Sequence, residues 1–165
     1  MKATDLLVQC LENEGVEYIF GIMGKENLDL MDSLSRSKKI QFINVRHEQG
    51  AAFMADVYAR LSNKVGVCLA TLGPGATNLL TGIASANLDH SPVVAITGQA
   101  SFANQQKGSH QYLNIVKTFD LATKWSVQIK DSQTIPKMVR KAFREAQMEK
   151  PGAVLIELQK ISHHK

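Results

Sequence analysis

The chain alternates between short apolar runs and longer segments with helical periodicity, and this alternation constrains its fold more than any other feature. Two of the runs, VGVCLAT (65–71) and PVVAIT (92–97), are almost continuously apolar. Strands of this kind belong in a parallel sheet whose two faces are both covered by crossover helices. The sequence therefore predicts an α/β fold, a doubly wound three-layer sandwich with a mostly parallel sheet.

Hydrophobic periodicity and turn residues place six strands and the helices between them. A first helix follows Thr4 and Asp5, either of which can cap it, and Gly15 supplies its stop. The chain of 165 residues contains no linker-like stretch, so we expect one domain spanning 1–165. The other predicted strands are 17–22, 40–45, 125–129 and 153–158, and the other predicted helices are 26–34, 48–62, 79–88 and 132–148.

Charge and cysteine content argue against several classes of partner. The net charge is +4, and the one run of basic residues recurs at helical spacing, which is typical of a solvated helix face and not of a nucleic-acid patch. The first residues, MKATDLLVQCLENEG, lack a continuous apolar core, so no membrane partner is expected. Cys10 and Cys68 have no metal-ligand partner at motif spacing, and a reducing, cytoplasmic compartment fits them. The basic run consists of Lys137, Arg140, Lys141 and Arg144.

In doubly wound sheets, ligands sit beyond the carboxyl ends of the strands, so function is expected near residues 21–26, 46–49, 71–78 and 99–111. The turn Gly-Pro-Gly at 73–75 would present free backbone N–H groups there. Glycine and proline also punctuate many turns that bind nothing, and the turn alone leaves both interpretations open.

Three common loop motifs are incomplete in this chain. A dinucleotide fingerprint would need glycine at Asn78, and a phosphate-binding P-loop would need glycine at Ile19 and Ser or Thr at Glu26. The pair His47–Glu48 lacks the second histidine of a zinc motif, because that position holds Ala51. These residues therefore predict no dinucleotide, nucleotide-hydrolysis or metal site.

Glu48 follows the predicted strand 40–45 and opens the helix 48–62. This position places its carboxyl group at the first turn of the helix, directed into the strand-end crevice. An acid at a helix N-terminus is commonly only a favourable partner of the helix dipole. Position alone does not decide between that role and a functional one.

Three segments resemble thiamine-diphosphate-dependent enzymes, most closely those of the acetolactate synthase type: RHEQGAAFMADVYAR (46–60), LGPGATNLLTGIASANLDHSPVVAITGQ (72–99) and KPGAVLIEL (150–158). The similarity runs from Thr4 to about Gln159. It implies that the chain is the pyrimidine-binding (PYR) domain of the family, a doubly wound six-stranded sheet. The family's central domain and its diphosphate-binding domain, whose Gly-Asp-Gly segment and Asn bind Mg²⁺, are absent from this chain.

The resemblance also implies roles for individual residues. Glu48 would be catalytic: it would hydrogen-bond a ring nitrogen of the aminopyrimidine and favour the imino tautomer, whose nitrogen removes the proton of the thiazolium carbon. Gln111 would reach the reaction side. The family usually carries proline where this chain has Met23. The implied cofactor-binding residues, besides Glu48, are Met23, Gly24, Thr71, Pro74 and Asn78.

The implied activity is that of a transferase of branched-chain amino acid biosynthesis, which joins two 2-oxo acids, normally two pyruvates, with loss of carbon dioxide. The full-length enzyme would be a homodimer or tetramer with thiamine diphosphate between subunits, and this chain alone would be inactive. A related 2-oxo acid decarboxylase or lyase, a stand-alone PYR subunit that pairs with a separate diphosphate-binding chain, and a module that only binds a partner are the alternatives. His163 and His164 in the tail receive no role.

Overall fold

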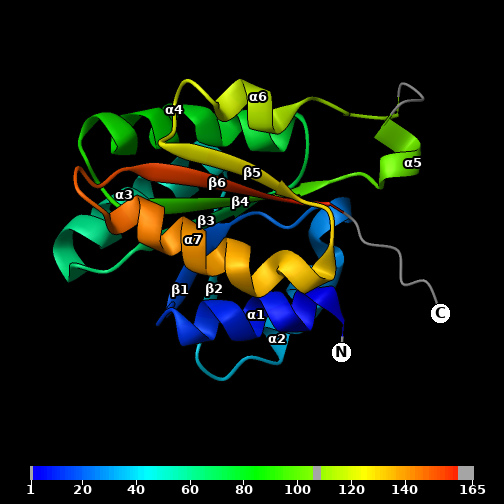
Figure 1. Ribbon diagram of the computed structural model, residues 1–165, viewed down its shortest axis with the longest axis horizontal. Helices are drawn as coiled ribbons and strands as arrows, with labels where there is room; N and C mark the ends of the chain where they lie inside the picture. Colours follow the sequence, from blue (N-terminus) through cyan, green and yellow to red (C-terminus); the bar gives the residue numbers. More distant parts are fainter. Residues whose placement is uncertain (1, 106–108, 160–165) are drawn as a thin grey trace.

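The computed structural model describes residues 2–105 and 109–159, in which a six-stranded sheet lies between two layers of helices (Figure 1). All of its strand pairs are parallel, and the order is β2-β1-β3-β4-β6-β5. This confirms the predicted α/β sandwich. The tail with His163 and His164 lies outside the described residues. The strands are β1 (Tyr18–Gly21), β2 (Gln41–Asn44), β3 (Gly66–Ala70), β4 (Val93–Gln99), β5 (Trp125–Ile129) and β6 (Ala153–Gln159).

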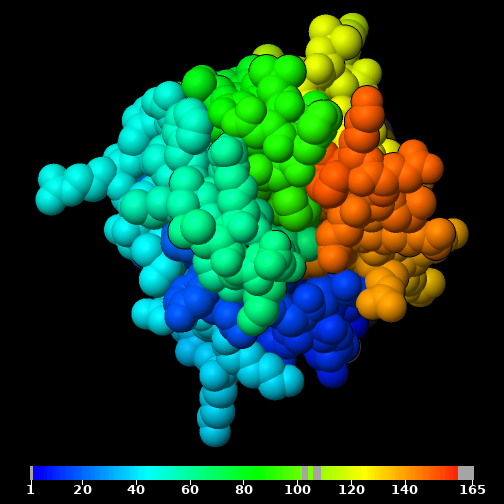
Figure 2. Space-filling model, turned by 90° about the vertical axis from the view of Figure 1, so that its left-hand side faces the viewer, coloured from blue at the N-terminus to red at the C-terminus, as the bar shows by residue number. Residues whose placement is uncertain are grey.

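The helices divide between the two faces of the sheet. In Figure 1, α4 and α6 lie above the sheet and α1, α2 and α7 below it, while α5 lies at the right, where the strands end. Figure 2 shows the opposite end, where blue, cyan-green, green and orange segments meet over the starts of the strands. The helices are α1 (Ala3–Asn13), α2 (Leu28–Ser35), α3 (Glu48–Ser62), α4 (Pro74–Leu88), α5 (Phe102–Gln105), α6 (Ile115–Phe119) and α7 (Ile135–Gln147), with 3₁₀ turns η1 (Lys25–Asn27) and η2 (Ser132–Thr134).

The strand order places β1 beside β3, although the chain leaves these two strands in different directions. From β1 it passes through α2 to β2 on one side, and from β3 it passes through α4 to β4 on the other. Such a reversal opens a crevice at the carboxyl ends of the two strands, the usual ligand position in open α/β sheets. The loops at residues 22–24 and 71–75 meet at this point.

Each face of the sheet has its own apolar core. One core joins the sheet to α1, α2 and α7, and the other joins it to α3, α4 and α6. Strands β3 and β4 are buried along their whole length, which explains their nearly continuous apolar sequences. Helices α3 and α4 approach each other closely, because a Cβ added at Gly82 would lie only 2.5 Å from the Cβ of Ala52.

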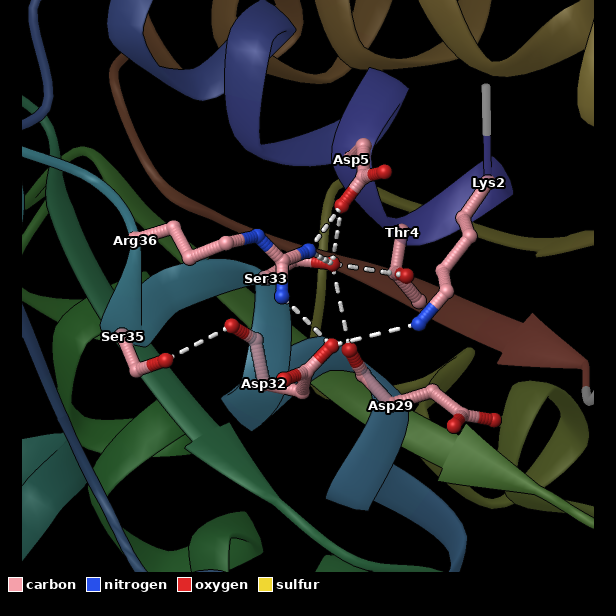
Figure 3. A network of polar contacts seen from close by, with 8 residues as sticks. All are labelled: Lys2, Thr4, Asp5, Asp29, Asp32, Ser33, Ser35 and Arg36. Carbon is pink, nitrogen blue, oxygen red and sulfur yellow. Dashed lines mark hydrogen bonds and ion pairs between the residues drawn. The ribbon is translucent and has the colours of Figure 1, made fainter.

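The start of the first helix differs from the prediction. Helix α1 begins at Ala3 and has no side-chain cap, so Thr4 and Asp5 lie inside its first turn. Their side chains instead reach α2, where the Ser33 hydroxyl lies 2.8 Å from Thr4 Oγ1 and 2.7 Å from Asp5 Oδ1 (Figure 3). Arg36 contacts the same aspartate. The bond from Ser33, together with that from Arg36, lowers the pKa of Asp5.

The basic run lies on the outer face of α7, as predicted for a solvated helix face, and all four side chains are exposed. Three of them make contacts: Lys141 lies 4.7 Å above the ring of Trp125, Arg140 bonds Glu14 at 2.9 Å, and Arg144 bonds the Met148 sulfur at 3.0 Å. Within residues 2–105 and 109–159, no helix combines the length and the apolar character needed to cross a bilayer.

A buried aspartate on α3 depends on one arginine, and this gives a first testable prediction. Asp56 is 2% exposed, and Arg60 bonds both of its carboxyl oxygens at 2.8 Å while also reaching Asp89. Arg60→Met would leave the Asp56 charge buried without its cation, which is strongly unfavourable. We expect Arg60→Met to lower the urea midpoint of unfolding, and Asp56→Asn added to it to recover part of the loss. A double variant less stable than Arg60→Met would contradict this.

Candidate active site

Glu48 opens α3 and lies over the glycine turn that follows β3. The preceding residue, His47, caps the helix by accepting a hydrogen bond from the Gln49 amide at 3.2 Å. The half-buried Glu48 side chain then takes a bond from Asn78 Nδ2 to its Oε2 at 3.0 Å. Its Oε1 lies 3.3 Å from the position that a Cβ on Gly75 would occupy. The carboxyl group therefore faces the turn.

The turn at residues 73–75 has a shape that only glycine accommodates well. Gly73 has φ 57° and ψ −121°, a region that residues with a Cβ rarely adopt. A Cβ at this position would also overlap the carbonyl oxygen of Gln111. Pro74 then takes the first position of α4, where its fixed φ suits a helix and its missing N–H costs nothing. The turn is thus packed against the end of a distant loop.

The loop after β1 contacts the same turn. A Cβ on Gly24 would lie 2.5 Å from the Cβ of Thr71, so the backbone of this loop rests directly on the threonine. Met23 is 53% exposed at the rim. Asn27 holds the loop in shape: its Oδ1 accepts from the Gly24 amide at 2.7 Å, and its Nδ2 donates to the Ile22 carbonyl at 3.4 Å.

Gln111 reaches this region through its backbone. It has φ 61°, an uncommon conformation for a residue other than glycine, and its carbonyl oxygen packs on Gly73. The Gln111 side chain is exposed. The amide of Tyr112, the next residue, bonds the Ser109 carbonyl at 3.1 Å. The structure therefore brings the Gln111 backbone to the glycine turn.

The crevice between β1 and β3 thus gathers most of the predicted site residues. Glu48 and Asn78 are joined directly, and Gly24 lies against Thr71, beside Gly75. Pro74 and Met23 are exposed at the edge. A carboxyl group with one oxygen held by an amide and the other beside a glycine can share a proton with a nitrogen heterocycle. Among the described residues, no group of His, Cys, Asp and Glu is placed to hold a metal ion.

Residues 1–118 match the family model described as thiamine pyrophosphate enzyme, N-terminal TPP binding domain. The chain belongs to this family. This confirms the resemblance read from the sequence, and the domain is homologous to acetolactate synthases from plants, bacteria and archaea.

Three relatives of this TPP-binding domain come from a plant, a bacterium and an archaeon. Over 159 residues the chain is 42% identical to the chloroplastic acetolactate synthase of Arabidopsis thaliana, covering 96% of the chain and 24% of the relative. It is 42% identical to the acetolactate synthase of Bacillus subtilis, covering 94% and 27%. It is 43% identical to a probable acetolactate synthase large subunit of Methanocaldococcus jannaschii, covering 97% and 27%. The chain therefore spans about a quarter of the length of these relatives.

One buried acid was not predicted from the sequence as a candidate site residue. Glu157 lies on β6 and is 2% exposed, and its Oε1 accepts from Gln99 Nε2 at 2.9 Å. It faces a polar hollow of about 520 Å³, which Lys130 and Tyr112 also line. Burial raises the pKa of Glu157 to about 7, although bonds from Gln99 and Gln128 and the charge of Lys130 oppose the shift. A charged residue inside the apolar run AVLIEL was the available signal.

The raised pKa of Glu157 predicts a pH-dependent stability. Because the folded protein holds this proton more tightly than the unfolded chain, where the pKa is 4.5, the associated stability is complete below 4.5 and is lost as the pH rises through about 7. Between about pH 4 and about pH 8 we expect the wild type to lose about 3 kcal/mol relative to Glu157→Gln. Urea unfolding of both proteins at the two pH values measures this difference. An unchanged difference would contradict the assignment.

Proposed function

We propose that the chain is the pyrimidine-binding domain of an acetolactate synthase, which joins two 2-oxo acids, normally two pyruvates, with loss of carbon dioxide. The observation that carries the proposal is the Glu48 carboxyl group, held by Asn78 and facing the glycine turn at the β1/β3 crevice. The similarity to acetolactate synthases along nearly the whole chain supports the choice of reaction.

Gly75 lies between the side chains of Thr71 and Glu48. A Cβ added at Gly75 would stand 2.8 Å from Thr71 Cγ2 and 3.3 Å from Glu48 Oε1. Glycine at this position therefore lets both side chains lie close to the backbone of the turn. A planar ring without bulky substituents can lie against such a backbone surface, and its ring nitrogens can meet the carboxyl group. The residues present thus suit the aminopyrimidine of thiamine diphosphate.

Within this proposal, Glu48 holds and transfers a proton. Asn78 occupies Oε2, so we assign Oε1 as the oxygen that meets the ring nitrogen. A carboxyl group is required because it can change its protonation state, whereas an amide cannot. When bound, the thiamine cofactor supplies an electron sink that stabilises a carbanion of the substrate.

The remaining site residues bind and orient. Thr71 and Gly24 would hold the ring from two loops, Met23 and Pro74 would flank it at the exposed edge, and Gln111 would face the 2-oxo acid. The diphosphate and its Mg²⁺ would be held by the diphosphate-binding domain of a longer protein.

We also propose that the full-length protein is a homodimer or tetramer. Helix α3 carries a row of large apolar side chains on its outer surface that are one-third or more exposed, and contiguous apolar surface of this kind is typical of protein contacts. A second copy of the protein is the occupant that we assign, because the cofactor site lacks its diphosphate half in this chain. We place the protein in the cytoplasm, which the two free thiols of Cys10 and Cys68 support. The apolar row consists of Phe53, Met54, Val57 and Leu61.

The test is an assay of the full-length protein with pyruvate, thiamine diphosphate and Mg²⁺. We expect acetolactate and carbon dioxide, and no product when thiamine diphosphate is omitted. Release of an aldehyde without acetolactate would assign the chain to a related decarboxylase. Turnover only after addition of a separate diphosphate-binding chain would make it a stand-alone PYR subunit. Failure to bind thiamine diphosphate in either setting would refute the proposal.

A further inference from the structure

Gln99, the last residue of β4, connects both ends of the loop that carries Gln111. It is 1% exposed, and its Oε1 accepts from the Ala100 amide at 2.9 Å. Its Nε2 donates to the Leu113 carbonyl at 3.0 Å. Ala100 begins the loop, and Leu113 follows Gln111 by two residues. One buried side chain therefore fixes the beginning and the end of residues 100–113.

Glu157 determines which way the Gln99 amide points. The second hydrogen of Gln99 Nε2 is donated to Glu157 Oε1 at 2.9 Å, in a position where Glu157 is itself buried. Above about pH 7, where Glu157 is ionised, its carboxylate accepts hydrogen bonds and cannot donate them, so it turns the NH₂ end of the amide toward itself. The carbonyl end then faces the Ala100 amide, and the remaining N–H faces Leu113. Exchanging the two ends of the amide would break all three bonds.

The bonds of Gln99 also affect the contact between Gln111 and the glycine turn. Gln111 holds an uncommon left-handed conformation with its carbonyl on Gly73, and such a conformation persists only where the surroundings impose it. On the far side of Leu113, Asn114 caps α6 by accepting from the Lys117 amide at 3.1 Å. The Leu113 carbonyl is thus held between a fixed helix start and Gln99, and the Gln111 backbone is held with it.

We propose that Gln99 and Glu157 are positioning residues whose buried hydrogen bonds hold the Gln111 loop end against the cofactor turn. The link to catalysis rests on the proposed function, because that function places Gln111 beside the 2-oxo acid. The link to loop position does not, because it follows from the three hydrogen bonds. A pair that merely satisfied buried polar groups would stabilise the whole domain and would have no selective effect on the loop.

Two variants of the full-length protein separate these cases. Gln99→Met keeps the length of the side chain and removes its amide. The exchanged pair Gln99→Glu with Glu157→Gln keeps the buried charge and one hydrogen bond between the two residues, so it is expected to fold. A carboxylate at position 99, however, has no N–H to donate to the Leu113 carbonyl. Gln147→Met on α7 is the matched control, because its amide bonds the Phe143 carbonyl within its own helix.

The measurement is hydrogen–deuterium exchange of residues 109–114 beside that of β4 and β6. We expect both variants to raise exchange in residues 109–114 by about tenfold, as for loss of one good hydrogen bond, and the control to leave it unchanged. In active protein, kcat should fall while the affinity for thiamine diphosphate stays constant, because Glu48 and its turn are not moved. Exchange that rises equally in the strands, or in no segment, would overturn the proposal. Absence of 2-oxo acid turnover in the wild type would count against the proposed function alone.

Discussion

Replacing Glu48 with glutamine in the full-length protein is expected to slow exchange of the proton on the thiazolium carbon of bound thiamine diphosphate by roughly a hundred- to ten-thousand-fold. Glutamine has nearly the same shape, and its side-chain oxygen can still accept the bond from Asn78. Only the ability to gain and lose a proton disappears. The fold and the thermal midpoint should therefore remain close to those of the wild type.

The protein is mixed with D₂O to start the exchange, which is stopped with acid at short times. The proton signal that remains on the thiazolium carbon is then recorded by NMR. Glu145→Gln on α7 is the matched control, because it makes the same chemical change on the other face of the sheet. An Asn78→Ala variant is expected to show a smaller loss, since it frees Glu48 Oε2 without removing the acid. Unchanged exchange in Glu48→Gln would remove Glu48 from its proposed role.

Gly73→Ala is expected to have the second large effect, a loss of at least about 3 kcal/mol in the free energy of unfolding, together with loss of cofactor binding. The strained backbone alone costs about 1–3 kcal/mol for a residue with a Cβ. The added Cβ also meets the Gln111 carbonyl, which is backbone and cannot rotate away. Because Gln99 holds the end of the Gln111 loop, relief requires that the glycine turn itself move, and this movement disturbs the surroundings of Glu48.

Substitutions at two other glycines separate the cost of backbone strain from the cost of the contact with Gln111. Gly15 has φ 77° with nothing within 4 Å of an added Cβ, so Gly15→Ala should cost only about 1 kcal/mol for its left-handed conformation. Gly50 lies in α3 with equally open surroundings, and Gly50→Ala should stabilise the helix by about 0.5–1 kcal/mol. Denaturant titration of the three variants tests this ranking. Equal stability of Gly73→Ala and Gly15→Ala would show that the contact with Gln111 carries no weight.

Local sequence signals predicted the regular elements well where apolar spacing was strong. Helix α3 spans 48–62, as predicted, and β5 spans the predicted 125–129. Strands β4 and β6 extend to Gln99 and Gln159, beyond their predicted ends, because they carry buried polar residues that an apolar pattern does not include. Helix α4 starts at Pro74, several residues before its predicted start, because its first turn is rich in residues that also signal loops. The short helices α5 and α6 were not predicted.

The site was predictable only in part, because its members come from distant segments. The motifs located Glu48, Gly24, Thr71 and Asn78, and the structure places them in one crevice. Nothing local to the sequence indicated that Asn27 would shape the loop after β1. Buried polar contacts between strands and loops depend on the tertiary fold, and periodicity carries no information about them.

The seam between β1 and β3 is short, with only Phe20 paired to Cys68 and Gly21 to Leu69. It divides the sheet into a two-stranded unit, β2–β1, and a four-stranded unit. A molecule held between the Gly24 loop on one unit and the Thr71 turn on the other would contact both units and connect them. Thermodynamic linkage then requires that a ligand which stabilises the contact between the two units is itself bound more tightly when that contact is formed.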